Sequence, residues 1–202
     1  MKRCIIYFLF LGISVVTLYA QENKASKQIG KFGVSFSSFG GDDFFPFASV
    51  DGGASYNSQN YYAFALNYLR DINQRLEFET GLEYSKHKFI IEPSIPDLES
   101  KKSSLSLINI PLTVRVNFWK YVFVNGGILV DIDVTKDSDV DRQTGLGVMM
   151  GVGGKYDLSS GLSVFVNPYF KIHSLLSFEM ESIHYRLGNA GIRAGVTYAF
   201  GK

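Results

Sequence analysis

The feature that most constrains the fold is a strict alternation of apolar and polar residues in the segment 106–121. A period of two gives one apolar face and one polar face only in an extended strand. The even positions hold Ile108, Ile110, Leu112, Val114, Val116 and Phe118, and the odd positions hold Asn109, Pro111, Thr113, Arg115 and Asn117. Such a strand must join a sheet, and the class of protein depends on whether its apolar face meets a protein core or lipid.

The first 20 residues differ from the rest of the chain. Lys2 and Arg3 give a basic start, the run 5–18 is almost entirely apolar, and Ala20 precedes a polar stretch. This pattern is typical of a secretory signal peptide, and the apolar run is shorter than the roughly 20 residues of a membrane-spanning helix. We therefore expect a signal peptide at 1–20, cleaved after Ala20, and one domain at 21–202.

The composition of the exported part excludes several classes of protein. The single cysteine, Cys4, leaves with the signal peptide, so a disulfide scaffold is excluded. Loss of Lys2 and Arg3 leaves 18 basic against 19 acidic residues, which offers no large basic field for nucleic acid. The whole chain has 12 Tyr, 17 Phe and 20 Gly but 5 Pro, a composition rich in strand-forming aromatic residues.

Alternation of the same kind recurs along the chain and predicts eight strands. A long loop is expected at 40–60, and Pro111 and Pro168 are each expected to cause a β-bulge, because proline lacks the N–H that a closed ladder needs. An even number of strands is typical of single-chain outer-membrane barrels. Besides the strand around Pro111, the predicted strands are 29–39, 61–71, 75–90, 121–134, 146–156, 162–175 and the segment from about 187 to 200.

The apolar face is predicted to meet lipid. An eight-stranded barrel is only just wide enough for its own side chains, so the many large apolar residues of the even face would not fit inside. The predicted connections alternate between short turns and long loops, and aromatic residues gather at the strand ends, as in transmembrane barrels. The predicted fold is all-β, an eight-stranded antiparallel up-and-down transmembrane β-barrel in the cell outer membrane.

Three short motifs resemble the PorT-like outer-membrane β-barrel proteins. They are Ile110-Pro111-Leu112, the glycine-rich segment 151–154 and the closing segment 195–200. The resemblance implies an eight-stranded outer-membrane barrel of a Gram-negative bacterium. It also implies a link to protein secretion, because the namesake of the family is associated with a secretion apparatus.

The polar face is predicted to carry a lumen charge network. Isolated buried charges cost several kcal/mol, so these side chains must pair with one another. We expect an ion-pair plug that fills the lumen, with a path for protons or small solutes as the alternative. The residues are Glu77, Glu79, Glu83, Arg115, Asp131, Asp133, Lys155, Lys171, His173 and Arg193.

No catalytic, metal or cofactor site is predicted. The segment 136–141 resembles the start of a calcium loop, but Arg142 and Val148 stand where the EF-hand pattern needs Gly and Glu. Lipid-modifying barrel enzymes use His with Ser and an acid, and neither His173 nor His184 has a serine two residues later. A non-enzymatic role is therefore expected, with a lipid-modifying enzyme as an alternative.

The first long loop is the predicted site of contact with a partner protein. Its aromatic residues lie in a segment that otherwise reads as a polar loop, and exposed aromatic clusters mark interaction sites. The alternative is that they pack on the barrel rim or among lipid headgroups. Other expected partners are outer-membrane lipid and the insertion machinery for barrels. The loop residues are Asp42, Asp43, Phe44, Phe45 and Phe47.

Overall fold

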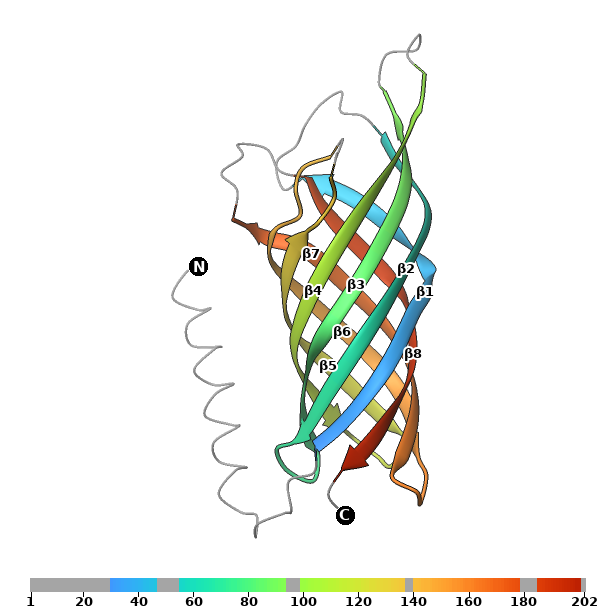
Figure 1. Cartoon of the computed structure of the whole chain (residues 1–202), viewed down its shortest axis with the longest axis vertical. Helices are drawn as coiled ribbons and strands as arrows, with labels where there is room; N and C mark the ends of the chain where they lie inside the picture. Colours follow the sequence, from blue (N-terminus) through green and yellow to red (C-terminus); the bar gives the residue numbers. More distant parts are fainter. Residues whose placement is uncertain (1–29, 47–54, 94–98, 137–139, 179–184, 201–202) are drawn as a thin grey trace.

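The computed structural model shows eight antiparallel strands closed into one barrel (Figure 1). It describes residues 30–46, 55–93, 99–136, 140–178 and 185–200, so the predicted signal peptide and Phe47 lie outside the described residues. Among these residues, no helix is long and apolar enough to cross a membrane. The strands are β1 (Gly30–Pro46), β2 (Ser55–Asp71), β3 (Leu76–Glu92), β4 (Lys101–Asn117), β5 (Val122–Asp133), β6 (Gly145–Asp157), β7 (Leu162–Ser177) and β8 (Tyr185–Phe200).

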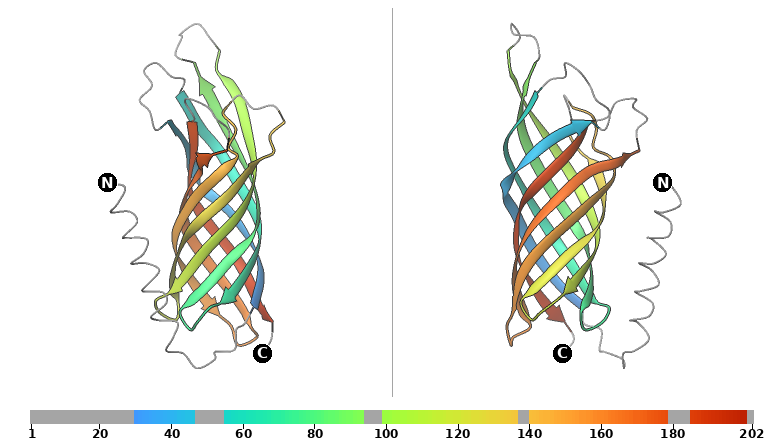
Figure 2. Two further views of the ribbon diagram at one scale, coloured as in Figure 1. Left: turned by 90° about the vertical axis from the view of Figure 1, so that its left-hand side faces the viewer. Right: turned by 180° about the vertical axis from the view of Figure 1, so that it is seen from behind.

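Each strand pairs with its neighbour in sequence, and β1 pairs with β8 to close the ring. Closure leaves no unpaired sheet edge, which a barrel in lipid requires. The start of β1 and the end of β8 lie at the same end as the short turns, as the views in Figure 2 also show. In transmembrane barrels this is the periplasmic end, and the long connections face outward from the cell. The predicted fold class is confirmed.

The outer face of the barrel is apolar. Its large side chains stay exposed in the isolated chain, which a folded soluble protein rarely permits over so wide an area. Trp119, 76% exposed, and Phe118, 59% exposed, lie near the periplasmic rim, where membrane proteins place interfacial aromatic residues. Residues at least 40% exposed across the barrel wall include Phe64, Leu66, Leu82, Ile128, Met150, Val152, Val166 and Ile192.

The predicted loop at 40–60 is wrong, because β1 continues to Pro46 and β2 begins at Ser55. A one-residue register shift between Ser38 and Gly41 explains the missed pattern. Phe39 lies there with φ of 59°, the left-handed conformation typical of some bulges. The extra residue exchanges the two faces of the strand, so that even positions of β1 point outward before the bulge and inward after it.

The predicted bulges at Pro111 and Pro168 are also wrong. The register is the same on both sides of Pro111 in its pairing with β3 and β5, and on both sides of Pro168 in its pairing with β6 and β8. Instead, the β3–β4 ladder lacks the pair that Pro111 would form with Gly81, and the β6–β7 ladder lacks the pair that Pro168 would form with Val152. The sheet therefore accommodates the lost N–H by interrupting one ladder locally rather than by inserting a residue.

Candidate functional site

The lumen is filled by side chains from all eight strands. Positions of β3 that point inward run from the periplasmic end outward as Glu77, Glu79, Glu83, Ser85, His87 and Phe89, and each is at most 5% exposed. They mark successive layers of the interior. The layers are acidic and basic at the periplasmic end and in the centre, contain two histidines further out, and are apolar at the outer end.

The central layer joins one carboxylate to two guanidinium groups, and we call Glu79, Arg115 and Arg193 the central cluster. Arg115 Nη2 donates to Glu79 Oε2 at 3.0 Å, and Arg193 Nη1 donates to Glu79 Oε1 at 2.8 Å. The Arg115 guanidinium also lies 4.2 Å from the ring centroid of Phe123. The two guanidinium groups bind one buried carboxylate and stack on aromatic rings. The central cluster therefore forms a rigid and wide obstruction of the lumen.

The next layer outward pairs Lys171 with Glu83. The Lys171 ammonium donates to Glu83 Oε1, and Asn109 Nδ2 donates to the same oxygen at 3.2 Å. The ammonium also lies 4.6 Å from the ring centroid of Tyr169. This lysine therefore has both an anionic and an aromatic neighbour, and the layer adds a second ion pair to the fill of the lumen.

Two histidines form the layer above. His173 Nδ1 lies 3.0 Å from Asp131 Oδ1, and His87 Nδ1 lies 2.9 Å from Asp42 Oδ1. The two imidazole centroids are 5.9 Å apart, and His87 stacks on the ring of Tyr61 with centroids 5.7 Å apart. His87 was not among the predicted network residues, although the alternation of the predicted strand 75–90 puts this odd position on the polar face. Its partner Asp42 lies beyond the bulge of β1 and was assigned to a loop.

Asp42 and Phe44 are therefore not in an exposed partner-binding loop. Both are in β1 and point into the barrel, where Asp42 also accepts a hydrogen bond of 2.7 Å from Asn189 Nδ2. Asp43 is exposed and Phe45 is half-buried on the same strand. The bulge moves Asp42 and Phe44 to the inner face, so of the predicted cluster Asp43 is the described residue that remains well exposed.

An apolar cluster, here named the outer cap, closes the outer end of the lumen. Phe44 and Phe89 meet with ring centroids 4.9 Å apart, and Tyr56 lies 4.9 Å from Phe44. The outer cap was not predicted, because the face opposite the apolar wall was interpreted as polar throughout, although Phe89 and Leu107 stand at odd positions of the predicted strands. The buried members are Phe44, Phe89, Leu105, Leu107 and Leu187, and Tyr56, Ile91, Val140 and Tyr185 pack against them.

Asp133 differs from the other predicted network residues because both oxygens of its carboxylate bind backbone N–H groups. Its carboxylate accepts hydrogen bonds from the N–H groups of Thr135, at 2.8 Å, and Gln143, at 3.1 Å. The buried Gln143 side chain in turn donates to the carbonyl of Tyr185 at 2.7 Å. Asp133 therefore holds the connection after β5 against the outer end of the barrel.

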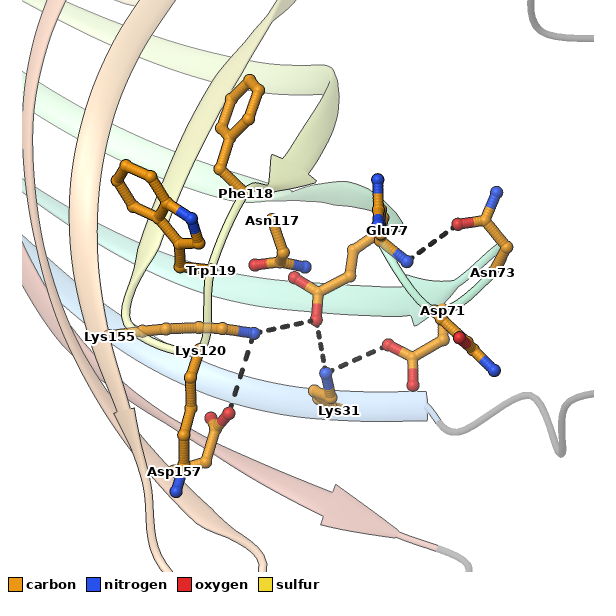
Figure 3. Close-up of a pocket in the computed structure, with 12 residues that line it drawn as sticks. Lys31, Asp71, Asn73, Glu77, Asn117, Phe118, Trp119, Lys120, Lys155 and Asp157 are labelled. Atoms are coloured by element: carbon orange, nitrogen blue, oxygen red, sulfur yellow. Dashed lines mark hydrogen bonds and ion pairs between the residues drawn. The ribbon is translucent and has the colours of Figure 1, made fainter. Parts of the chain in front are cut away.

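The periplasmic mouth contains a cavity of about 450 Å³ whose inner end is closed by ion pairs (Figure 3). Lys31 Nζ lies 2.5 Å from Glu77 Oε1 and 3.0 Å from Asp71 Oδ1. Lys155 Nζ lies 3.6 Å from Glu77 and 3.7 Å from Asp157. These side chains come from β1, β2, β3 and β6, so the mouth is crossed by paired charges rather than leading into an open pore.

Three side chains are arranged like the hydrogen-bonded chain of a serine hydrolase. His87 lies between Ser85 and Asp42, with Nε2 3.0 Å from Ser85 Oγ and Nδ1 2.9 Å from Asp42. Ser85 is 2% exposed and His87 is 1% exposed, beneath the outer cap. A substrate could not reach the hydroxyl in this arrangement. Among the described residues, no group of three or more His, Cys, Asp or Glu could hold a metal ion.

Known structures share this architecture. The chain is similar to the outer membrane protein AlkL, solved in lipid bilayers, with a TM-score of 0.57 and 15% identity over 89% of this chain and 94% of AlkL. It is similar to the outer membrane protein OprG of Pseudomonas aeruginosa, with a TM-score of 0.56 and 11% identity over 87% of this chain and 96% of OprG. The chain has the fold of outer-membrane β-barrel proteins.

Together with the exposed apolar wall, this likeness places the protein in the outer membrane, as predicted. Neither a protein-family model nor a curated protein sequence matches the chain. The resemblance to PorT-like proteins therefore stays a prediction. A sequence identity of 11–15% shows only that the fold is shared, so the function of this chain follows from its own residues.

Proposed function

We propose that this chain is a non-conducting, non-enzymatic outer-membrane barrel of a Gram-negative bacterium that acts as an anchored interaction or assembly component. The observation that carries the proposal is the filled lumen. The central cluster, the Glu83–Lys171 pair, the histidine layer and the outer cap follow one another with no layer lacking buried side chains. A barrel filled in this way serves as a scaffold, and its contacts with other molecules are then made at its rims and outer face.

The outward extension of the strands supports a role in contact with a partner. A tilted strand crosses the hydrocarbon layer in about 9–11 residues, whereas β2, β3 and β4 have 17 residues each. At the end opposite the start of β1 and the end of β8, β3 and β4 rise beyond the rest of the barrel (Figure 1). The outer cap fixes the base of this extension, so a partner would meet a preformed surface. The PorT-like resemblance makes a secretion apparatus the first place to search.

Site-specific photocrosslinking in cells tests this proposal. A photoreactive amino acid at the exposed Ser100, beside the start of β4, should give a discrete protein adduct of constant mass. The matched control carries the same amino acid at the exposed Gln74, in the short turn between β2 and β3. An adduct specific to position 100 supports the proposal. Absence of any adduct at position 100 in an abundant, folded barrel contradicts an interaction role for the extension.

A lipid-modifying hydrolase is the second candidate, favoured by the hydrogen-bonded chain of Ser85, His87 and Asp42. An activated serine reacts with fluorophosphonate probes, which require access to the hydroxyl. Because Ser85 is buried under the outer cap, we expect no labelling of the folded barrel in detergent or in outer membrane. Labelling that disappears in Ser85→Ala would replace our proposal with the enzymatic one.

A further inference from the structure

Three lysines gather on the outward face of β3 and β4, directly above the apolar wall, and we name Lys86, Lys88 and Lys102 the lysine face. Lys86 and Lys88 are successive outward residues of β3, and Lys102 pairs with Ile90 at the next outward position. Lys88 and Lys102 are therefore diagonal neighbours across the two strands, about 7–8 Å apart at the backbone. These residues line a surface groove of about 390 Å³ with Gln59, Ser103 and Ser104.

The lysine face lies at the depth of the outer-leaflet headgroups. On β3 the outward residues from Leu76 to Tyr84 span nine positions, and on β4 those from Ile108 to Val116 also span nine. This length matches one crossing of the hydrocarbon layer. The next outward residues are Lys86 on β3 and Ser106 on β4, which pair in register. The lysines are thus the first charges that the sheet presents above the membrane core.

Two tyrosines mark the same boundary. Tyr62 pairs with Lys86 across β2 and β3, and Tyr84 lies one outward position below Lys86. The Tyr84 hydroxyl is 3.4 Å from Ser106 Oγ. Tyrosine with an apolar ring and a polar end is typical of the interface between hydrocarbon and headgroups. The two tyrosines therefore indicate the depth of the lysine face independently of the strand length.

The charge of the lysine face is not balanced by an ion pair among the residues that the structure describes. In the described ranges, none of the three lysines forms an ion pair with a carboxylate. Like charges side by side on a sheet are unfavourable unless an anion joins them. A one-residue register shift in β2 between Ser58 and Asn60 leaves the exposed Gln59 unpaired beside Lys88, which adds an amide to the groove. The amide, hydroxyl and ammonium groups of this groove can all donate hydrogen bonds to the oxygens of a phosphate ester.

We propose that the lysine face binds the phosphorylated headgroup of an outer-leaflet glycolipid, with the acyl chains of the lipid lying along the apolar wall below. Lys86 and Lys88 meet one phosphate from the side of β3, and Lys102 meets it from β4. The membrane position of the groove favours a lipid phosphate over a soluble one, because the apolar residues beneath it bind acyl chains. This inference concerns a lipid site and does not depend on a protein partner at Ser100.

The test is binding of bis-phosphorylated lipid A to the full mature barrel in a neutral detergent, measured by native mass spectrometry. The variants are Lys86→Gln/Lys88→Gln, Lys102→Gln and, as a control with the same loss of two charges, Lys120→Gln/Lys136→Gln. Lys120 lies at the periplasmic rim, and Lys136 follows β5 outside the groove. Resistance of the folded barrel to SDS without heating verifies that each variant folds.

We expect the Lys86/Lys88 double variant to bind lipid A at least tenfold more weakly, Lys102→Gln to bind it several-fold more weakly, and the control to change by less than twofold. Lipid A without phosphates should bind the wild type as weakly as the double variant does. Equal binding by the double variant and the wild type, or by the two forms of lipid A, would overturn the proposal. Displacement of the lipid by millimolar inorganic phosphate alone would also overturn it, in favour of a soluble anion.

Discussion

At the scale of single residues, the interior depends on charged side chains that form ion pairs with one another across the barrel. Glu79 is 1% exposed and is the shared anion for Arg115 and Arg193, which reach it from β4 and β8. Removing the shared partner of a buried ion pair is far more costly than removing an exposed charge, because the remaining charges stay buried without compensation. The central cluster is therefore the part of the lumen most sensitive to substitution.

Glu79→Ala is expected to destabilise the barrel by about 3–5 kcal/mol, because it leaves two buried guanidinium groups without their anion. The measurement is urea unfolding in lipid vesicles, followed by the fluorescence of the single tryptophan, Trp119. Glu92→Ala removes an exposed carboxylate from the same strand and should change stability by less than about 0.5 kcal/mol. Equal stabilities of the two variants would show that the central cluster does not stabilise the fold.

A glycine decides how closely Tyr61 packs against β8. A Cβ built on Gly191 would lie 1.4 Å from the hydroxyl oxygen of Tyr61, which is 2% exposed and has little room to move. Gly191→Ala should therefore destabilise the barrel by about 1–3 kcal/mol through overpacking. Gly41→Ala is the control, since no atom lies within 4 Å of its Cβ position. Loss of stability in the control but not in Gly191→Ala would contradict this packing.

At the scale of elements, the bulge in β1 decides which side chains line the lumen. The register shift between Ser38 and Gly41 turns Asp42 and Phe44 inward, where one meets His87 and the other joins the outer cap. The strand beyond the bulge pairs with Tyr185–Ala190 of β8, 139 to 149 residues later in the chain. One inserted residue thus supplies both an anion for the histidine layer and an aromatic ring for the outer cap.

The outer cap should behave as a packed core. Phe89→Ala removes a 1% exposed ring that contacts Phe44 and Tyr56, and it should cost about 3–5 kcal/mol. Phe89→Leu keeps most of the volume and should cost less than about 1.5 kcal/mol. Both are measured by the same urea titration. If the two substitutions cost the same, the cap is not closely packed and its role in closing the lumen is wrong.

The sequence predicted the number of strands and the apolar wall because alternation is local and strong, as in the segment from Ile108 to Phe118. It did not predict the outer half of β1, where Gly40, Gly41 and Asp43 resemble a loop and become strand by pairing with β8. The alternation of the predicted strand 75–90 puts His87 on the polar face, but its partner could not be predicted, since Asp42 is 45 residues away and beyond a bulge. Signals that depend on distant pairing are absent from a local pattern.

At the scale of the whole molecule, the barrel combines an apolar wall, a filled interior and an outward extension. The first places it in lipid, the second supports our proposal that it is not a pore, and the third supports our proposal that it contacts a partner. The interior of an eight-stranded barrel is only wide enough for its own side chains, and here those side chains are paired or packed. The central claim is therefore that the folded protein does not conduct.

Single-channel recording in a planar bilayer tests this claim most directly. The purified mature barrel is inserted at constant voltage in concentrated salt, and a reference porin is added afterwards to show that the bilayer accepts active pores. We expect the current to stay at its baseline until the porin is added, because the central cluster and the outer cap block the lumen. Reproducible conductance steps that scale with the number of inserted barrels would contradict a closed lumen and favour a narrow channel.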